Sequence, residues 1–353
     1  MSRSDVRPAG VFAVWVLSAC ATAASPPPAA PPAKVPAPAA IPVVEKTREE
    51  LQVAPWEIAL SGVRGEGETT ESVTAKNLLD RPVTVSGVNV RGDAAPLFAV
   101  KSASAFPAVI PAHGTLSVEL SFRPPSDAEA GLKRAVLRFQ TGAAQDDGPA
   151  TDLSALVLRG REVGSEPTLS QIVETLGYAI DVGGKSLQLP SVGGPDQVAA
   201  ALFERARAAP VAINPVARFS KDGAVPYGYY LPGTSLKQVD TKQLAVISEG
   251  QHQTLNPGLE ADAITSFDPG AGRFGIWVGP PEERTFSENR RNRGAQRSLA
   301  RVFPLRSRGG EPIPDAYLIA FGNESRGDFQ DGVFVLWNVR IADQKAAAAV
   351  AKP

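Results

Sequence analysis

Short stretches of alternating apolar and polar residues fill the chain between residues 49 and 163, and turn residues separate them. Residues 71–75, 83–85 and 116–122 are examples. Successive side chains of a strand point to opposite faces, so a period of two indicates strands with one buried face. Gly, Pro, Asn and Asp interrupt the pattern where hairpin loops would be required. The pattern predicts about seven antiparallel strands in an immunoglobulin-like sandwich over residues 49–163.

Residues 164–343 begin with a helical pattern. Thr168 and Gln171 have the spacing of a capping box, and Gly177 follows as a stop signal. A second helical piece is expected at Asp196–Ala208. Alternation then returns at residues 211–219, 227–231, 263–267, 273–278, 299–303, 316–321 and 333–339. We therefore predict a mainly β protein, whose second unit is a β-sandwich of jelly-roll type with one or two short helices.

The first 20 residues have the pattern of an export signal. Arg3 and Arg7 precede an apolar run at residues 11–17, which is too short to span a bilayer of about 30 Å. Leu17-Ser18-Ala19-Cys20 resembles the signal box of bacterial lipoproteins, in which the Cys is acylated and becomes the first mature residue. The resemblance implies a palmitate-type lipid anchor on Cys20, and Ala21 favours the outer membrane. The alternative is cleavage elsewhere, with Cys20 there by chance.

Residues 21–48 are almost entirely Pro, Ala and Ser up to about Val43. Proline fixes φ and removes backbone donors, so we expect a polyproline-II-like tether that rises about 3.1 Å per residue. A proline-rich ligand for a partner domain is the less favoured interpretation. Residues 344–353 form an Ala/Lys tail that we expect to be disordered.

Composition excludes several classes of protein. The 36 basic and 37 acidic residues give a net charge of −1, so no overall field attracts nucleic acid. One Cys and two His residues leave no intramolecular disulfide and too few ligands for a His/Cys zinc site. The sequence contains no G-x-S-x-G, Walker or H-E-x-x-H motif. We therefore expect that the protein is not an enzyme. The alternative is a carbohydrate-active hydrolase with a carboxylate pair in the second domain.

Residues 49–163 carry a family resemblance. The order of Ala75-Lys76-Asn77, Leu97-Phe98-Ala99-Val100, Ile110-Pro111-Ala112-His113-Gly114 and Leu120-Ser121-Phe122-Arg123-Pro124 resembles the ASH/hydin-type immunoglobulin-like family, which is related to major sperm protein. Members are scaffolding or adhesion modules without a catalytic site, so the resemblance implies a structural or binding role. His113 is expected to be an exposed loop residue.

The second unit also carries a resemblance. Residues 316–321, Gly327-Asp328-Phe329-Gln330-Asp331 and residues 333–339 resemble an uncharacterised module of bacterial extracellular proteins with a G-D-Y-Q-D-Y-V-F-like motif. The departures are Gly322 in place of an acid and Gly332 in place of an aromatic residue. The resemblance implies binding at a cell surface rather than catalysis.

Asp328, Asp331 and Glu324 place several oxygen ligands in one short stretch. Calcium takes six to eight oxygens, so a structural calcium site is one interpretation. The favoured interpretation is that the aspartates cap turns by accepting backbone N–H groups. Gly322 removes a further carboxylate, and we expect no cofactor.

Arginines concentrate between residues 284 and 308, where Glu288 is the only acid. The candidate anion-binding residues are Arg284, Arg290, Arg291, Arg293, Arg297 and Arg301. Guanidinium groups bind phosphate and carboxylate, so the expected partners are surface polysaccharide, lipopolysaccharide or peptidoglycan, besides the membrane itself. The alternative is a solvated loop that acids of the protein neutralise. Exposed Trp or Tyr on the second unit would favour glycan binding, and buried aromatics would favour a structural role.

Overall fold

The computed structural model describes residues 50–101, 105–142, 148–161, 165–189, 194–198, 202–233, 239–292, 299–322 and 327–342. The chain divides into two units, and all of these residues belong to the one that spans residues 40–353. The expected signal peptide, Cys20, the tether and the tail at residues 344–353 lie outside the described residues. No helix in the described part is long and apolar enough to cross a membrane.

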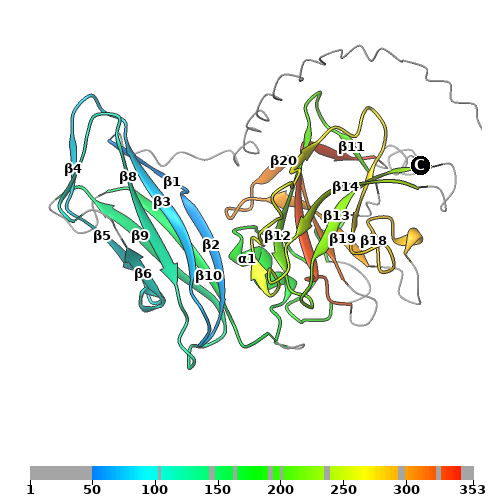
Figure 1. Cartoon of the computed structure of the whole chain (residues 1–353), viewed down its shortest axis with the longest axis horizontal. Coiled ribbons are helices and arrows are strands. Elements are labelled where there is room, and N and C mark those ends of the chain that lie inside the picture. The colour runs from blue at the N-terminus through cyan, green and yellow to red at the C-terminus, as the bar shows by residue number, and fades with distance from the viewer. Residues whose placement is uncertain are drawn as a thin grey trace, which may run out of the picture. The chain divides into compact units, whose positions relative to one another are not determined.

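The first sandwich consists of two four-stranded sheets (Figure 1, blue to green). One sheet has the order β1 (Leu51–Ala54), β3 (Thr69–Asn77), β8 (Thr115–Phe122), β6 (Phe98–Lys101). The other has the order β2 (Glu57–Val63), β10 (Ala150–Leu158), β9 (Gly131–Gln140), β5 (Gly87–Arg91). Strands β4 (Val83–Val85) and β7 (Ala108–Ile110) form a small separate sheet, and η1 (Ala95–Leu97) is a 3-10 turn. The predicted immunoglobulin-like sandwich is confirmed, except that β10 pairs with β2 in parallel rather than antiparallel.

The alternation in the sequence explains the core of this sandwich. Along β8, Leu116, Val118 and Leu120 are buried, while Ser117 and Glu119 between them are exposed. Asn77 is fully buried at the end of β3, where its amide Nδ2 donates to the carbonyls of Arg81 (2.8 Å) and Pro111 (2.9 Å). A buried amide costs free energy unless its hydrogen bonds are satisfied, and here it fixes two loops.

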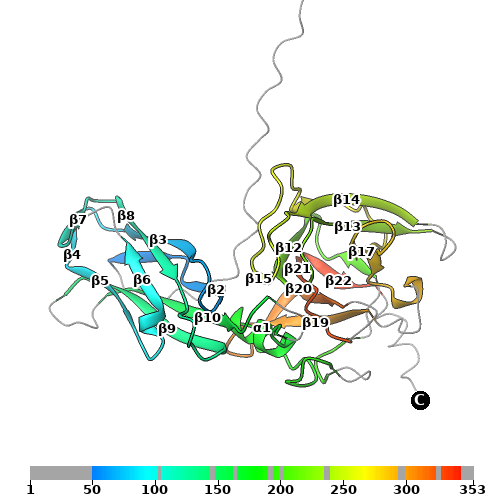
Figure 2. The same cartoon turned by 60° about the horizontal axis from the view of Figure 1, so that its bottom comes forward.

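The second sandwich is built on a sheet with the order β15 (Thr254–Leu255), β12 (Val211–Arg218), β21 (Gly332–Trp337), β20 (Pro312–Phe321), β19 (Ala300–Arg306), and β16 (Ser266–Phe267) also pairs with β12. A second sheet has the order β14 (Val239–Ile247), β13 (Val225–Pro232), β17 (Gly275–Val278), β18 (Thr285–Phe286). Strands β11 (Phe203–Arg205) and β22 (Val339–Ile341) form a short pair, and η2 (Asn289–Arg291) follows β18. Figure 2 shows the two larger sheets as layers. The predicted second β-sandwich is confirmed.

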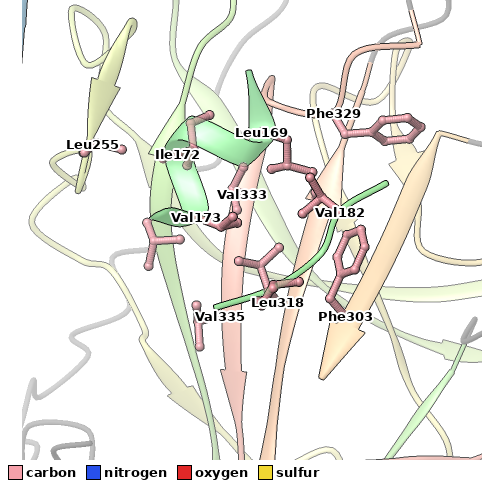
Figure 3. Packing of buried hydrophobic residues seen from close by; sticks show 14 of the residues in the cluster. Leu169, Ile172, Val173, Val182, Leu255, Phe303, Leu318, Phe329, Val333 and Val335 are labelled. Atoms are coloured by element: carbon pink, nitrogen blue, oxygen red, sulfur yellow. The ribbon is translucent and has the colours of Figure 1, made fainter. Parts of the chain in front are cut away.

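Helix α1 (Leu169–Thr175) begins with the predicted capping box. The Thr168 hydroxyl accepts from the Gln171 N–H at 3.2 Å, and the Gln171 side chain accepts from the Thr168 N–H at 3.0 Å. Figure 3 shows Leu169, Ile172 and Val173 of α1 beside side chains of the β20 and β21 strands. The helix therefore covers one face of the larger sheet, as its apolar stripe predicts.

The second expected helix, at Asp196–Ala208, is wrong for its described residues. Phe203 to Arg205 form β11, which pairs with β22. Phe203 is fully buried and also bridges to Phe274. Sheet pairing and burial of a large aromatic side chain outweigh the helical propensity of this Ala-rich stretch.

The two sandwiches share a hydrophobic cluster within the compact unit. Val63, Leu156 and Leu158 of the first sandwich are buried in the same cluster as α1 and Leu255. The Leu255 N–H donates to the Ser61 hydroxyl at 2.9 Å, and the Asn256 amide donates to the Ala59 carbonyl at 3.1 Å. Residues 254–256 therefore cover the edge of β2 that faces away from β10.

Candidate functional site

The clustered arginines converge in part on one buried acid. Glu288 is fully buried at the start of η2. Its Oε1 accepts from Arg290 Nε at 2.9 Å and Nη2 at 2.7 Å, and its Oε2 accepts from the Tyr230 hydroxyl at 3.0 Å and from Arg291 Nε. Burial opposes the charged form, but the hydrogen bonds from Arg291, Arg290 and Tyr230 outweigh it and hold the pKa of Glu288 below its ordinary value.

The other arginines of the predicted set lie in different surroundings. The Arg284 guanidinium stacks over the Trp277 ring, 3.9 Å from its centroid, and donates to the Thr241 hydroxyl at 3.3 Å. Burial lowers the pKa of Arg284. The Arg301 side chain is buried on β19, 4.1 Å from the centroid of Phe329, and burial lowers its pKa as well. Arg293 and Arg297 lie outside the described residues.

These placements separate the predicted anion-binding residues into three groups. Arg290 and Arg291 bind Glu288, Arg284 covers an indole ring, and Arg301 lies within the second sandwich. Arg290 is the most accessible member of the ion pairs, with a side chain that is 66% exposed. Because Glu288 is the only acid of the stretch, the sequence already contained the signal for this pairing.

The second predicted group lies in the loop before β21. Asp328 and Gln330 are buried, and Asp331 is half-buried. The loop is joined to β12 by a hydrogen bond from the Phe219 N–H to the Gln330 carbonyl at 2.9 Å. Glu324 lies outside the described residues. Within the described ranges no three His, Cys, Asp or Glu side chains are grouped so that they could hold a metal ion.

A buried arginine that we did not single out from the sequence lies beside this loop. Arg218 is 1% exposed, and its guanidinium donates to the Ser220 hydroxyl at 3.0 Å and the Lys221 carbonyl at 2.6 Å. Burial lowers the pKa of Arg218, although the carboxylates of Asp222 and Asp331 act in the opposite direction. Arg218 thus orders the loops at one end of the second sandwich.

His252 and Asp222 form a pair at the same end. His252 Nδ1 lies 3.0 Å from Asp222 Oδ1, which also accepts the N–H groups of Gly250 (2.8 Å) and Gly223 (2.7 Å). These backbone bonds are the main reason that the pKa of Asp222 is lowered. A His–Asp pair supplies two parts of a nucleophilic triad. Among the described residues no Ser, Thr or Cys side chain is bonded to His252. The contacts of Asp222 with His252 and Gly250 join the loop at residues 222–223 to the loop at residues 250–252.

Several large aromatic side chains of the second sandwich are internal, and Tyr229, Phe286, Tyr317 and Trp337 are half-buried. Tyr227 and Tyr230 are fully buried and Trp277 is 1% exposed. The Trp277 indole Nε1–H donates to the Tyr229 carbonyl at 3.0 Å, which satisfies its polar atom internally. In the described part of this sandwich, Ile264 is the exposed large apolar residue, and no aromatic side chain is comparably exposed. The described residues of the second sandwich therefore include no aromatic ring of the exposed class, whereas Trp56, between β1 and β2 of the first sandwich, is 37% exposed.

No known family model matches the chain, and no curated protein matches it significantly. Solved structures give weak likenesses. The ASH/PapD-like domain 7 of human CEP192 is 12% identical over 35% of this chain and 99% of its own, with a TM-score of 0.22. A proposed carbohydrate-binding protein from Bacteroides ovatus is 10% identical over 83% of this chain and 97% of its own, with a TM-score of 0.24.

A family 123 glycoside hydrolase from Clostridium perfringens is 14% identical over 33% of this chain, with a TM-score of 0.23. The chain covers 24% of that hydrolase, about a quarter of its length. Likenesses at these TM-scores identify neither a family nor an activity.

Proposed function

We propose that the protein is a non-catalytic lipoprotein of the cell envelope, whose two sandwiches act as a structural or adhesion unit. The burial of the aromatic side chains in the second sandwich carries this proposal. Sugar-binding and catalytic surfaces expose aromatic rings or convergent polar groups in a cavity. Here the Trp277 indole N–H donates to the Tyr229 carbonyl, and the Tyr230 hydroxyl donates to Glu288, so these polar groups are satisfied within the fold.

The sequence supplies the attachment in this proposal. An acylated Cys20 holds the protein in the membrane, because each buried methylene contributes about 0.8 kcal/mol. Ala21, which follows the Cys, favours the outer membrane. The tether at residues 21–48, fully extended as polyproline II, reaches about 90 Å. The folded unit is then free to act at a distance from the lipid surface.

The test separates anchoring from ligand binding. Cys20→Ser is expected to move the protein from the membrane fraction to the soluble fraction, and mass spectrometry of wild type is expected to find acyl chains on Cys20. A Cys20→Ser protein that stays in the membrane, with no acyl mass on wild-type Cys20, would refute the anchor.

Envelope polymers test the structural role. The soluble Cys20→Ser protein is expected not to bind lipopolysaccharide or peptidoglycan in pull-downs at low ionic strength, since Arg290 and Arg291 are paired with Glu288. Salt-sensitive binding that Arg290→Gln abolishes would favour the polyanion-binding role instead. Arg81→Gln is the control, because the Arg81 side chain is exposed and lies outside the arginine cluster.

A further inference from the structure

One strand of the first sandwich has a free edge over part of its length. Strand β9 begins at Gly131, and β10 pairs with it from there to Arg138. On the other side, β5 pairs with β9 only from Val136 to Gln140. No backbone hydrogen bond joins residues 131–134 to another described residue on that side. The backbone groups along this edge are therefore available to another strand.

A groove with a volume of about 700 Å³ runs beside this free edge. It is bounded by residues 93–97, by the turn at residues 125–129, and by Gln171 and Glu174 of α1. Ligand-binding pockets typically measure about 300 to 1,000 Å³. The groove is large enough for several residues of an extended peptide. Its apolar lining consists of Ala94, Pro96, Leu97, Pro125, Ala128 and Leu132.

The charges of the groove leave one carboxylate unbalanced. Lys133 Nζ lies 3.0 Å from Glu129, and Arg134 Nη2 lies 3.1 Å from Glu174. Asp93 is exposed and forms no ion pair with any described residue. The groove therefore carries a net negative charge that a basic side chain of a ligand would neutralise.

We propose that this groove binds an extended segment of a partner protein, which adds as a strand to residues 131–134 of β9 and places a Lys or Arg side chain beside Asp93. Strand addition takes its affinity from backbone hydrogen bonds and its specificity from alternate side chains. Small apolar side chains fit the Pro, Ala and Leu lining. The chain's own tether is a poor occupant, because its prolines lack the N–H groups that the edge requires. The inference rests on the proposed adhesion role and names its partner class.

The experiment selects ligands on the intact soluble chain. A library of random 12-residue peptides displayed on phage is selected against the full-length Cys20→Ser protein, and enriched peptides are synthesised. Amide hydrogen exchange is then measured with and without peptide. Bound peptide is expected to slow exchange at residues 132 and 134, whose N–H groups point to the free side, because new backbone hydrogen bonds protect these amides.

Two charge variants test the position of the ligand. Asp93→Lys is expected to weaken binding of basic peptides about 5- to 10-fold. Asp127→Lys is the matched control, because Asp127 is exposed in the adjoining turn but does not line the groove. It is expected to leave the dissociation constant unchanged.

Three results would overturn the inference: no enriched peptide, unchanged exchange at residues 132 and 134 in the complex, or equal binding to the two lysine variants. Such a failure is distinguishable from failure of the proposed function, which is tested by acylation and membrane fractionation. A missing lipid anchor would leave the peptide result intact.

Discussion

Glu288 shows how a single carboxylate changes the meaning of a charged stretch. The sequence places many arginines near it and suggests a site for an external anion. The structure buries this carboxylate and supplies four hydrogen bonds from Tyr230, Arg290 and Arg291. The anion for these two arginines is internal. Sequence spacing could indicate the pairing with residues two and three positions away, but not the hydroxyl of Tyr230, which lies 58 positions earlier.

Removing this carboxylate is expected to destabilise the fold. Glu288→Ala leaves Arg291, whose side chain is 3% exposed, without its buried partner. Breaking a buried pair in this way costs about 3 to 5 kcal/mol of unfolding free energy, measured by urea denaturation. Glu129→Ala is the control, because the Glu129 side chain is 89% exposed and its pair contributes about 1 kcal/mol or less. Equal losses in the two variants would contradict the buried-pair explanation.

Acid is expected to weaken the same site. The pKa of Glu288 is lower in the folded protein than its ordinary value of 4.5. The unfolded chain therefore binds the proton more readily, so the stabilisation is complete above pH 4.5 and is lost as pH falls through the lower folded value. Thermal midpoints between pH 2 and 7 should fall more steeply in wild type than in Glu288→Gln. Parallel profiles would assign the acid sensitivity to other groups.

At the level of elements, local signals were reliable and non-local ones were not. The start of the helix at residues 169–175 can be predicted from the four residues of its capping box. The burial pattern of β8 can likewise be predicted from the alternation within the strand itself. Residues 203–205 carry a helical pattern but pair with residues 339–341, which no local rule reveals. The contact between Asp222 and His252 likewise joins loops 30 positions apart, and no spacing rule connects residues at that separation.

The capping box offers a test at this scale. Thr168→Ala removes the hydroxyl that accepts the Gln171 N–H and is expected to cost about 1 kcal/mol of unfolding free energy. Thr168→Ser should retain most of the stability, since its hydroxyl can accept the same bond. Denaturant midpoints compare the three proteins. A loss in the Ser variant as large as that in the Ala variant would point to the lost methyl group rather than the cap.

For the whole molecule, the sequence predicted two sandwiches but not the cluster that they share. Nothing in the local sequence distinguishes Val63 and Leu158 from other apolar strand residues. In the structure both are buried in one cluster with α1 and Leu255. Strand periodicity predicts that a strand has an apolar face. It does not predict which other apolar face packs against it, because that depends on contacts between distant strands. Each sandwich thus has a core of its own, and a third cluster joins the two across the predicted boundary near residue 164.

The shared cluster predicts cooperative unfolding. Wild type is expected to show one calorimetric transition, because unfolding either sandwich would expose the common core. Leu255→Asp places a charge in that cluster, where Leu255 is 5% exposed, and is expected to split the transition into two. Ile264→Asp is the control, since Ile264 is 49% exposed, and should keep a single transition. Two transitions in wild type would show that the sandwiches unfold separately.

The cover over the edge of β2 also has a consequence in time. Ser61 is bonded to Leu255, which lies 194 residues further along the chain. Ribosomes add about 5 to 20 residues per second, so β2 waits about 10 to 40 s before the segment that protects its edge is made. During that interval the bare strand is a template for pairing with other nascent chains. Protection of this edge therefore comes only when residues 254–256 have been made and have folded against it.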